Sequence, residues 1–305
     1  MINKRPALIF SLIAKGAFEM KNLRRCGLLV ASLLVLSACG GGQQVEFGYV
    51  HLQNNVTGFV TSDGDTAIAI GLKKGSELKP SIDTYLNTLT PNYWTELMGD
   101  MVSLRNSEGT YSSNLSFADV SNGTFKVGME CAYEPFNWTQ ADDSNSAYPI
   151  ANIPGKFANG YDVQIAAQVA NALHMKLEIY QYEWEALLPA VNSGTITAII
   201  AGMSPTEERL VEIDFSANYY QSNLVVITRQ GNRLLECKTL KEIDQAGVRI
   251  AAQPGTFHLD ALKEQTSNLT VVDNLADFVA MRMALEAGSI DGYIAEEPTA
   301  LTLCK

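Results

Sequence analysis

Hydrophobic positions along the chain change their period several times, and each period predicts an element. After residue 123, short apolar runs alternate with stretches whose apolar residues recur every three or four positions. These are the patterns of buried strands and amphipathic helices. The predicted strands are 124–130, 176–183, 196–204, 224–229, 248–253, 269–273 and 290–297, and the predicted helices are 161–175, 184–194, 238–247, 255–265, 275–288 and 298–305. Strands separated by helices predict an α/β fold with parallel sheets covered by helices.

The first part of the chain has elements of its own. The predicted strands are 45–52, 57–62 and 65–72, and the predicted helices are 76–89 and 92–104. Ser76 is the expected N-cap of the first of these helices. The stretch 106–123 is rich in Ser, Asn and Gly, which predicts a linker between this part and the rest of the chain.

Residues 1–38 predict an export signal that is separate from the fold. Basic residues shortly after Met20, a possible start, precede the apolar run 27–36, which is too short for an ordinary membrane-spanning helix. The run ends in Leu-Ser-Ala-Cys, which resembles a bacterial lipobox and implies lipid attachment to Cys39. A plain secretory signal with a chance cysteine is the alternative. Residues 39–44 are then an anchor and tether, which predicts an extracytoplasmic protein held at the bacterial cell membrane.

Charge and cysteine content narrow the possible functions. The formal net charge of −11 argues against a nucleic-acid-binding protein, which normally carries a basic patch. Cys131, Cys237 and Cys304 follow the predicted anchor, and the last two either pair as a disulfide or all three are free thiols. The sequence has no C-x-x-C, and its histidines are scattered, so no metal site is expected. We expect a monomer without a cofactor.

Long strings between residues 125 and 298 carry a specific resemblance. The strings are VGMECAYEPFNW, GYDVQIAAQVA, WEALLPAVNSGTITAIIAGMSPTEERLVEIDFSANYYQSN, AAQPGTFH and MRMALEAGSIDGYIAEEP. They resemble the bacterial extracellular solute-binding proteins of family 3, the polar amino-acid-binding proteins of ABC importers. This resemblance implies a type II periplasmic-binding-protein fold, with two lobes, two crossover strands and a ligand in the cleft. It also implies binding of a free polar or cationic amino acid and its delivery to an ABC permease.

The order of elements departs from that family. Members need more chain after the DGYIAEEP string, to complete lobe 2, cross back and close lobe 1, and here those pieces stand ahead of the linker. We therefore expect a circular permutation, which is tolerated where chain ends lie close together. The expected parts are 45–65 in lobe 2, 66–105 as crossover and closing helices of lobe 1, the linker 106–123, 124–228 in lobe 1 and 229–305 in lobe 2. An unrelated front domain joined to a truncated binding protein is the alternative.

The resemblance implies a carboxylate subsite in the string AGMSPTEER. Arg209 is expected to clamp the α-carboxylate of the ligand, because a planar guanidinium donates two parallel hydrogen bonds. The backbone N–H groups around Gly202, Met203 and Ser204, with the Ser204 hydroxyl, would complete an anion-binding nest.

The loop QPGTFH is expected to add donors from lobe 2. By the resemblance, Thr256 and its backbone contact the carboxylate, and Gln253 and Phe257 belong to the same site. Pro254 departs from many relatives and removes a donor. His258 could line the rim of the site, but it is expected to face solvent instead.

Acidic and aromatic residues are expected to bind the rest of the ligand. Glu296 follows a predicted strand and is assigned to the ammonium group, and Glu130 to a basic or amide side chain. Tyr133 and Trp184 occupy aromatic positions of the family and are expected to sandwich the ligand side chain. Aromatic faces attract cations, which suits a cationic ligand.

No catalytic set is recognisable, so we expect a binding protein rather than an enzyme. The serine in GMSPT does not form a G-x-S-x-G elbow. Two alternatives remain open. Glu130 and Glu296 could act as an acid and base in a dehydratase of cyclic amino-acid precursors, which occurs on this fold. The protein could also be a lipoprotein sensor that presents its ligand to a membrane receptor.

Overall fold

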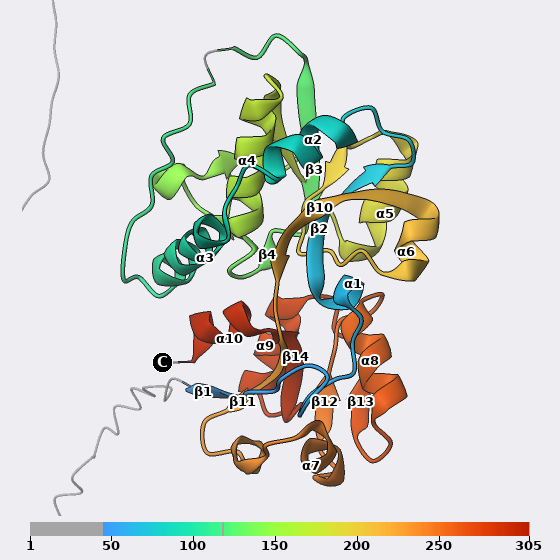
Figure 1. Ribbon diagram of the computed structural model, residues 1–305. Helices are drawn as coiled ribbons and strands as arrows, with labels where there is room; N and C mark the ends of the chain where they lie inside the picture. The colour runs from blue at the N-terminus through green and yellow to red at the C-terminus, as the bar shows by residue number, and fades with distance from the viewer. Residues whose placement is uncertain (1–44, 118, 305) are drawn as a thin grey trace, which may run out of the picture. The chain divides into compact units, whose positions relative to one another are not determined.

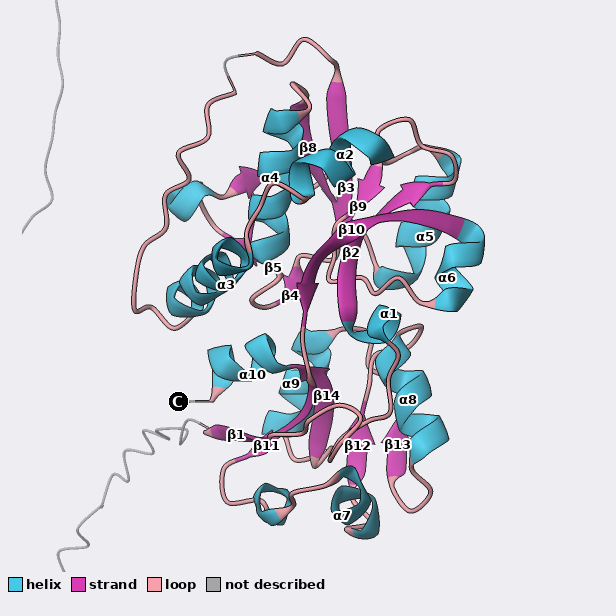
Figure 2. Cartoon of the chain, in the orientation of Figure 1, coloured by secondary structure: helices cyan, strands magenta, loops and turns pink. Residues whose placement is uncertain are grey.

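Two five-stranded mixed sheets, each in a lobe of its own, organise the computed structural model, which describes residues 45–117 and 119–304 (Figure 1). The predicted export signal and Cys39 lie outside the described residues. The chain passes between the sheets twice, around residues 62–67 and 221–224 (Figure 2). Lobe 1 is therefore one uninterrupted stretch, whereas lobe 2 is assembled from two separate stretches.

The sheet of lobe 1 has the strand order β10-β2-β9-β3-β8. Its strands are β2 (Ala67–Lys73), β3 (Thr124–Met129), β8 (Lys176–Gln181), β9 (Ala198–Ile199) and β10 (Ile213–Gln221). β3 is parallel to β8 and β9, and β2 is antiparallel to β9 and β10. Residues 67–72 are all buried, as expected of an interior strand covered on both faces. The first part of the chain thus provides an interior strand of lobe 1.

Helices and a small antiparallel sheet cover the sheet of lobe 1. The helices are α2 (Lys79–Leu86), α3 (Pro91–Arg105), α4 (Tyr161–Ala172), α5 (Trp184–Ser193) and α6 (Glu207–Glu212). The small sheet has the order β4-β5-β7-β6, made of β4 (Ala132–Tyr133), β5 (Asn137–Gln140), β6 (Tyr148–Pro149) and β7 (Phe157–Asn159), with the 3₁₀ turn η1 (Ser144–Ser146). The N-cap predicted at Ser76 is wrong: α2 starts at Lys79, with Pro80 in its first turn, a position that favours helix initiation.

The sheet of lobe 2 repeats the same pattern of directions, in the order β1-β11-β14-β12-β13. Its strands are β1 (Phe47–Val50), β11 (Leu224–Arg229), β12 (Arg249–Ala251), β13 (Thr270–Val272) and β14 (Gly292–Glu296). β12, β13 and β14 are parallel, and β11 is antiparallel to β1 and β14. Around it lie η2 (Arg233–Glu236), α7 (Leu240–Gln245), α8 (Phe257–Gln265), α9 (Phe278–Glu286) and α10 (Glu297–Leu303).

The strand predicted over 57–62 is absent. The chain turns there instead, with the Gly58 N–H donating to the Gln53 carbonyl, and Phe59 is fully buried in the core of lobe 2. The short helix α1 (Asp63–Thr66) follows and was not predicted. Its capping box, made by Ser62 and Asp65, starts the helix at the passage into lobe 1.

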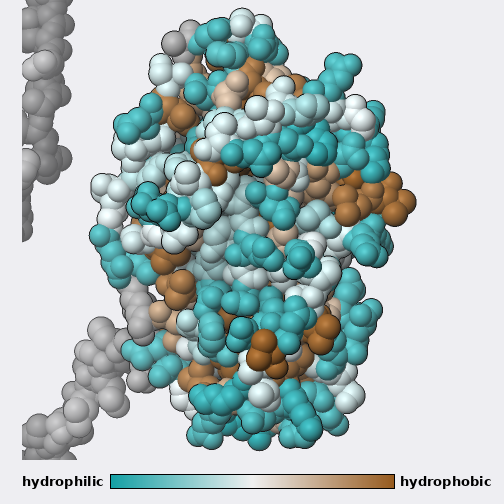
Figure 3. Space-filling view, viewed as in Figure 1, coloured by the Kyte–Doolittle hydropathy of each residue, from teal (hydrophilic) through white to brown (hydrophobic). Residues whose placement is uncertain are grey.

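Two hydrophobic clusters form the core. The larger fills lobe 1 and continues through Tyr133 and Phe278 onto one face of the sheet of lobe 2. The smaller lies within lobe 2 and includes Val50, Val226 and Ile294. The face of the molecule in Figure 3 is mostly hydrophilic with small separate hydrophobic patches, which is ordinary for a protein surface.

The structure also bears on the expectations for the cysteines, the linker and membrane-spanning helices. Cys131, Cys237 and Cys304 are free, so the disulfide alternative is not realised. The linker runs along lobe 1 (Figure 1), where the Tyr111 N–H donates to Asn145 Oδ1 over 3.1 Å. In the described part of the chain, no helix is both long and apolar enough to cross a membrane.

Candidate functional site

A narrow space lies where the two lobes meet, and both lobes line it. The lining residues are Glu130, Tyr133, Trp184, Ala201, Gly202, Ser204 and Arg209 from lobe 1, with Gln253, Thr256, Phe257, His258, Phe278 and Glu296 from lobe 2. About 320 Å³ between them is free of protein atoms, but only about 20 Å³ of it admits the centre of a water molecule. The two lobes are therefore packed closely against each other around this space.

Nearly every predicted site residue lines this space. Met203 does not: its side chain is fully buried, and its carbonyl accepts a hydrogen bond from the Ala69 N–H of β2. Ala201, His258 and Phe278 line the space and were not assigned to the site from sequence. Long-range packing brings them there, because His258 and Phe278 begin helices of lobe 2 that abut lobe 1.

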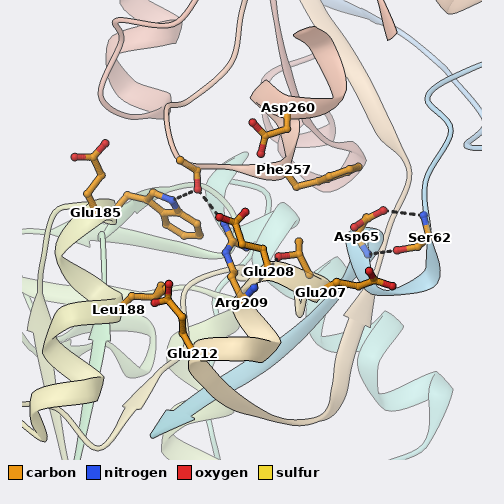
Figure 4. Close-up of a pocket in the computed structure, with 13 residues that line it drawn as sticks. Ser62, Asp65, Glu185, Leu188, Glu207, Glu208, Arg209, Glu212, Phe257 and Asp260 are labelled. Atoms are coloured by element: carbon orange, nitrogen blue, oxygen red, sulfur yellow. Dashed lines mark hydrogen bonds between the residues drawn. The ribbon is translucent and has the colours of Figure 1, made fainter. Parts of the chain in front are cut away.

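Arg209 is the buried cation of the site. It lies in α6, whose N-cap Thr206 accepts a hydrogen bond from the Arg209 N–H. One guanidinium nitrogen, Nη1, donates to the Ser204 carbonyl over 3.0 Å. The other, Nη2, donates to the Gly255 carbonyl of lobe 2 over 3.0 Å (Figure 4). Burial lowers the pKa of Arg209 to about 10, so the side chain stays charged at neutral pH. Its donors contact backbone carbonyls that a carboxylate could replace.

Trp184 lines the site and also contacts Arg209. Its Nε1 donates to the same Gly255 carbonyl over 2.8 Å. The Arg209 guanidinium carbon lies 5.2 Å from the centroid of the Trp184 ring, within cation–π range. Gly255 thus accepts hydrogen bonds from two side chains of the opposite lobe, which fastens the lobes together.

Glu130 is one of two buried carboxyl groups in the site. It follows β3, and its Oε1 accepts a 2.7 Å hydrogen bond from Gln253 Nε2 of lobe 2. The same nitrogen donates to the Ala276 carbonyl over 2.8 Å. Burial raises the pKa of Glu130 to about 8, against the opposing effect of the Gln253 hydrogen bond. A cation beside this carboxyl would lower that pKa again.

Glu296 is the second buried carboxyl group, and His258 is its partner. Glu296 Oε1 lies 3.0 Å from His258 Nε2. Within the described part of the chain, Glu296 Oε2 and His258 Nδ1 are buried without a hydrogen-bond partner. Burial raises the pKa of Glu296 to about 8, and burial together with Arg209 lowers the pKa of His258 to about 4. Glu296 therefore has an unsatisfied oxygen that a donor could satisfy.

The expectation that His258 faces solvent is wrong. The residue is 7% exposed. It lies in the first turn of α8, on the face that also buries Leu259, Ala261 and Leu262. That face packs toward the sheet of lobe 2. The imidazole therefore lies beside Glu296, at the end of β14.

Aromatic side chains fill the middle of the site. Tyr133 of β4 and Phe278 at the start of α9 lie face to face, with ring centroids 3.8 Å apart and planes 13° apart. Phe136 stacks on the other face of Tyr133 at 4.9 Å. Gly202 has a φ of +63°, and a Cβ there would lie 3.1 Å from Tyr133 Cε1. Glycine thus leaves room for the tyrosine ring.

Two hydroxyl groups of the predicted site make internal contacts. Ser204 Oγ donates to the Asp65 carbonyl over 2.8 Å, and Thr256 Oγ1 donates to the Gln253 carbonyl over 2.7 Å. The Ser204 hydroxyl thus ties its loop to α1, and the Thr256 hydroxyl bonds within its own loop. Both protons are committed, so these hydroxyl groups could only accept hydrogen bonds from a ligand.

An acidic groove of about 700 Å³ lies at the mouth of the site (Figure 4). Its charged lining residues are Asp65, Glu185, Glu207, Glu208, Glu212 and Asp260, together with Arg209. Carboxylates in a concave surface raise the local concentration of cations. Among residues 45–117 and 119–304, no cluster of His, Cys, Asp and Glu is arranged to hold a metal ion.

Comparison with known proteins agrees with this geometry. Residues 125–280 match the model of the bacterial extracellular solute-binding proteins, family 3. A probable histidine-binding protein of Campylobacter jejuni is 29% identical over 177 residues, which are 58% of this chain and 61% of the relative. The L-cystine-binding protein of Escherichia coli is 27% identical over 198 residues, which are 62% of this chain and 68% of the relative. The match to the Campylobacter protein thus spans about three fifths of that relative.

A solved structure supports the same fold. The amino acid ABC transporter substrate-binding protein of Streptococcus pneumoniae, in a crystal structure bound to L-arginine, is 27% identical, with a TM-score of 0.51. The match covers 59% of this chain and 69% of that protein. With two α/β lobes joined by two crossings, this likeness confirms the expected two-lobed type II fold.

Proposed function

Because the chain belongs to the bacterial extracellular solute-binding proteins, family 3, we propose that it binds a free polar or cationic amino acid between its lobes and delivers it to an ABC permease. One observation carries this proposal: a buried arginine and two buried carboxyl groups line a single closed space made by both lobes. The relatives named above bind amino acids according to their names, which agrees with a site of this charge pattern.

The charges of the site suggest a pose for the ligand. Arg209 would bind the α-carboxylate in place of the Gly255 carbonyl. Glu296 would bind the ammonium through its unpartnered Oε2, and Glu130 would face the ligand side chain. With both carboxyl groups ionised, these three residues sum to −1. A ligand of charge +1 neutralises that sum, and buried charges are stable only when they are balanced.

Ligand capture requires hinge motion. The two chain crossings are the covalent connections between the lobes within the described residues. When the lobes separate, the contacts of Gly255 with Trp184 and Arg209 break and expose the guanidinium. Lobe 1 would then bind the carboxylate, and lobe 2 would close over the ammonium. Such closure around a ligand is a known hinge mechanism, and the closed form would dock on the permease.

Calorimetry of the purified full chain against the twenty amino acids and a cyclic amino-acid precursor tests this function. One amino acid that binds tightly without turnover would support it. Heat that continues as a cyclic amino-acid precursor is consumed would instead support a dehydratase, with Glu130, Glu296 and His258 as its acid–base groups. Loss of uptake on deletion of the gene would separate a transport role from a sensor role.

We also propose that the chain is circularly permuted and lipid-anchored. β1 lies at the edge of the lobe 2 sheet and β2 inside the lobe 1 sheet, so residues before the linker complete both lobes. The match to the Streptococcus pneumoniae structure covers 59% of this chain, which agrees with a permuted order of elements. Metabolic labelling with a radioactive fatty acid, in the native chain and in Cys39→Ala, tests the anchor.

A further inference from the structure

Asp162 is a fully buried carboxyl group that does not line the candidate site. It lies in the first turn of α4. Burial raises its pKa to about 6, and hydrogen bonds from Tyr219, Asn137 and Gly202 oppose that rise. The group is therefore mostly ionised at neutral pH, although these three partners are neutral. A buried charge without a counter-charge is costly, so packing alone does not explain an aspartate at this position.

The three partners of Asp162 belong to three separate segments of lobe 1. Asn137 Nδ2 of β5 donates to its Oδ2 over 2.8 Å, and Tyr219 Oη of β10 donates to its Oδ1 over 2.7 Å. The backbone N–H of Gly202, in the loop after β9, is the third donor. An ionised carboxylate has only acceptors, so both of its oxygens suit such partners. The amide nitrogen of an asparagine would instead meet a donor.

Asn137 links Asp162 to the loop that carries Glu130. Its Nδ2 donates to Asp162, and its Oδ1 accepts the Cys131 N–H over 2.8 Å. Cys131 has a φ of +57°, a left-handed conformation that a residue other than glycine adopts only where its surroundings enforce it. Because Cys131 directly follows Glu130, the hydrogen bond from Asn137 helps to fix the direction of the chain at Glu130.

The other two partners hold Asp162 itself in place. Gly202 lines the candidate site, and a Cβ there would lie 3.1 Å from the Tyr133 ring, so this backbone has little freedom to move. Tyr219 is fixed a second time, since its carbonyl accepts a 2.8 Å hydrogen bond from Tyr161 Oη. Asp162 is therefore a fixed acceptor from which Asn137 can orient the Glu130 loop.

We propose that Asp162 is a positioning residue of the binding site, which acts through Asn137 and Cys131 to hold Glu130 in the arrangement that binding requires. This role rests on the proposed function, because it serves the same site. Asp162 would not touch the bound amino acid. Its effect on affinity would therefore depend on the presence of the Glu130 carboxyl group.

Calorimetry of the purified full chain with L-arginine and L-histidine tests this role. Asp162→Asn should weaken the binding of both by about tenfold, because the new amide nitrogen meets a donor and the contact with Asn137 or Tyr219 is lost. Tyr219→Phe keeps the contact with Asn137 and should weaken binding by about threefold. Tyr180→Phe is the matched control. Its hydroxyl donates to Glu178 over 3.0 Å on the edge strand β8, and both affinities should remain unchanged.

Combination with Glu130→Gln separates positioning from a general structural role. If Asp162 acts through Glu130, Asp162→Asn should weaken binding by less than about threefold in the Glu130→Gln background, against about tenfold in the native background. Equal losses in both backgrounds would overturn the positioning role. Native affinity of folded Asp162→Asn protein would overturn it as well.

Hydrogen exchange of single amide protons, followed by NMR, gives a readout that needs no ligand. In Asp162→Asn the Cys131 amide should exchange at least about tenfold faster, whereas the amides of α8 in lobe 2 keep their native rates. Unchanged protection of Cys131 would overturn the positioning role. Should Asp162→Asn fail to fold, Tyr219→Phe is judged by the same measurement, with an expected acceleration of about threefold.

The two readouts also separate this role from the proposed function. If the native chain bound neither amino acid, the proposed function would fail for these two ligands. Faster exchange at Cys131 in Asp162→Asn would still show that Asp162 orients the Glu130 loop. Tight binding by the native chain, with unchanged exchange and affinity in Asp162→Asn, would leave the proposed function standing and overturn the role of Asp162.

Discussion

At the scale of single residues, the site combines one permanent cation with two carboxyl groups whose charge depends on a ligand. Arg209 spans the lobes through hydrogen bonds to Ser204 and Gly255. Glu130 and Glu296 are buried beside neutral partners, Gln253 and His258. Protein groups thus satisfy Arg209 and one oxygen of each carboxyl group, whereas Glu296 Oε2 and His258 Nδ1 have no hydrogen-bond partner among the described residues.

Replacing Arg209 with alanine should abolish most of the ligand affinity. A desolvated carboxylate that loses its charged partner costs several kcal/mol, so Arg209→Ala should weaken binding by roughly a hundredfold or more. Arg209→Lys should retain part of the affinity, because lysine supplies charge without the bidentate fork. Arg282→Ala on α9, where the side chain is 37% exposed, is the matched control, and calorimetry is the measurement. Near-native affinity of Arg209→Ala would refute the pose.

Binding of a cationic amino acid should strengthen as the pH rises toward 8. Burial raises the pKa of Glu130 and of Glu296 from 4.5 to about 8, so both carboxyl groups hold protons in the empty site at neutral pH. A cation requires the ionised form, and each released proton contributes up to about tenfold in affinity per pH unit. Calorimetry between pH 5.5 and 7.5 measures this slope, and Glu296→Gln should reduce it.

The same groups affect the stability of the empty protein in the opposite direction. Between pH 4.5 and 8 the folded chain binds more protons at Glu130 and Glu296 than the unfolded chain does. Their contribution to the free energy of unfolding is therefore fully present below pH 4.5 and is lost as the pH rises to about 8. Denaturant unfolding without ligand checks this trend. A rise in stability over that window, which disappears in Glu296→Gln, would contradict it.

Sequence reasoning identified residues that carry an evident chemistry or a family string, such as Arg209 and Glu296. It missed Phe278 and misplaced His258 because nothing local marks them. Phe278 opens an ordinary amphipathic helix, and its place in the site depends on contact with Tyr133, which is distant in the chain. Only the packing of the two lobes determines such a contact.

At the scale of elements, the strand and helix periods after the linker predicted the other strands of the two large sheets in that part of the chain, but missed β10, α6 and the small sheet β4-β5-β7-β6. The segment 57–62 was misread because apolar Phe59 and Val60 suggested a strand, whereas only Phe59 is buried and Val60 is 70% exposed. Hydrogen bonds of Asn55 with Thr61 close a turn there. Turn chemistry of this kind overrides a short apolar run.

Gly160 fixes the junction between the loop that follows Tyr133 and helix α4. Its φ is +129°, and a Cβ would lie 2.3 Å from the Phe136 carbonyl oxygen. Gly160→Ala should therefore destabilise the protein by about 3 kcal/mol, since backbone atoms cannot yield as a flexible side chain would. Guanidinium unfolding is the measurement.

Gly99 provides the matched control for that substitution. It lies inside α3, and nothing comes within 4 Å of its Cβ position. Gly99→Ala should stabilise the protein by about 0.5–1 kcal/mol, because alanine loses less backbone entropy in a helix. If both substitutions changed the free energy of unfolding equally, the close approach of the Phe136 carbonyl to Gly160 would not be the cause of the effect of Gly160→Ala.

At the scale of the whole molecule, the proposed circular permutation makes a direct prediction. Helix α10 packs against β1, so the end of the described chain lies beside its beginning (Figure 1). A rearranged chain that runs from 124 to 305 and continues through a short Gly/Ser linker into 45–105 should fold. It should bind the same amino acid within about threefold of the native chain, because both sheets and the residues that line the candidate site are preserved and only the contacts of the linker 106–123 are lost.

The stretch 124–305 alone is the decisive control for this rearrangement. It lacks β2, which lies between β10 and β9 and is buried along nearly its whole length. We expect it to remain unfolded by circular dichroism and to bind nothing. A folded, binding fragment would show that the first part of the chain is an accessory domain.

The order in which the lobes can form follows from the two crossings. All strands of the lobe 1 sheet lie between residues 67 and 221, whereas β1 finds its partner β11 only after the whole of lobe 1 has been traversed. Pairing β1 with β11 closes a loop that contains all of lobe 1. The entropy cost of closing this loop is smaller when lobe 1 has already folded. We therefore expect lobe 1 to fold first and lobe 2 to assemble around its two ends. Glu296 belongs to β14, the last strand among the described residues, so the proposed site would be completed only when lobe 2 assembles.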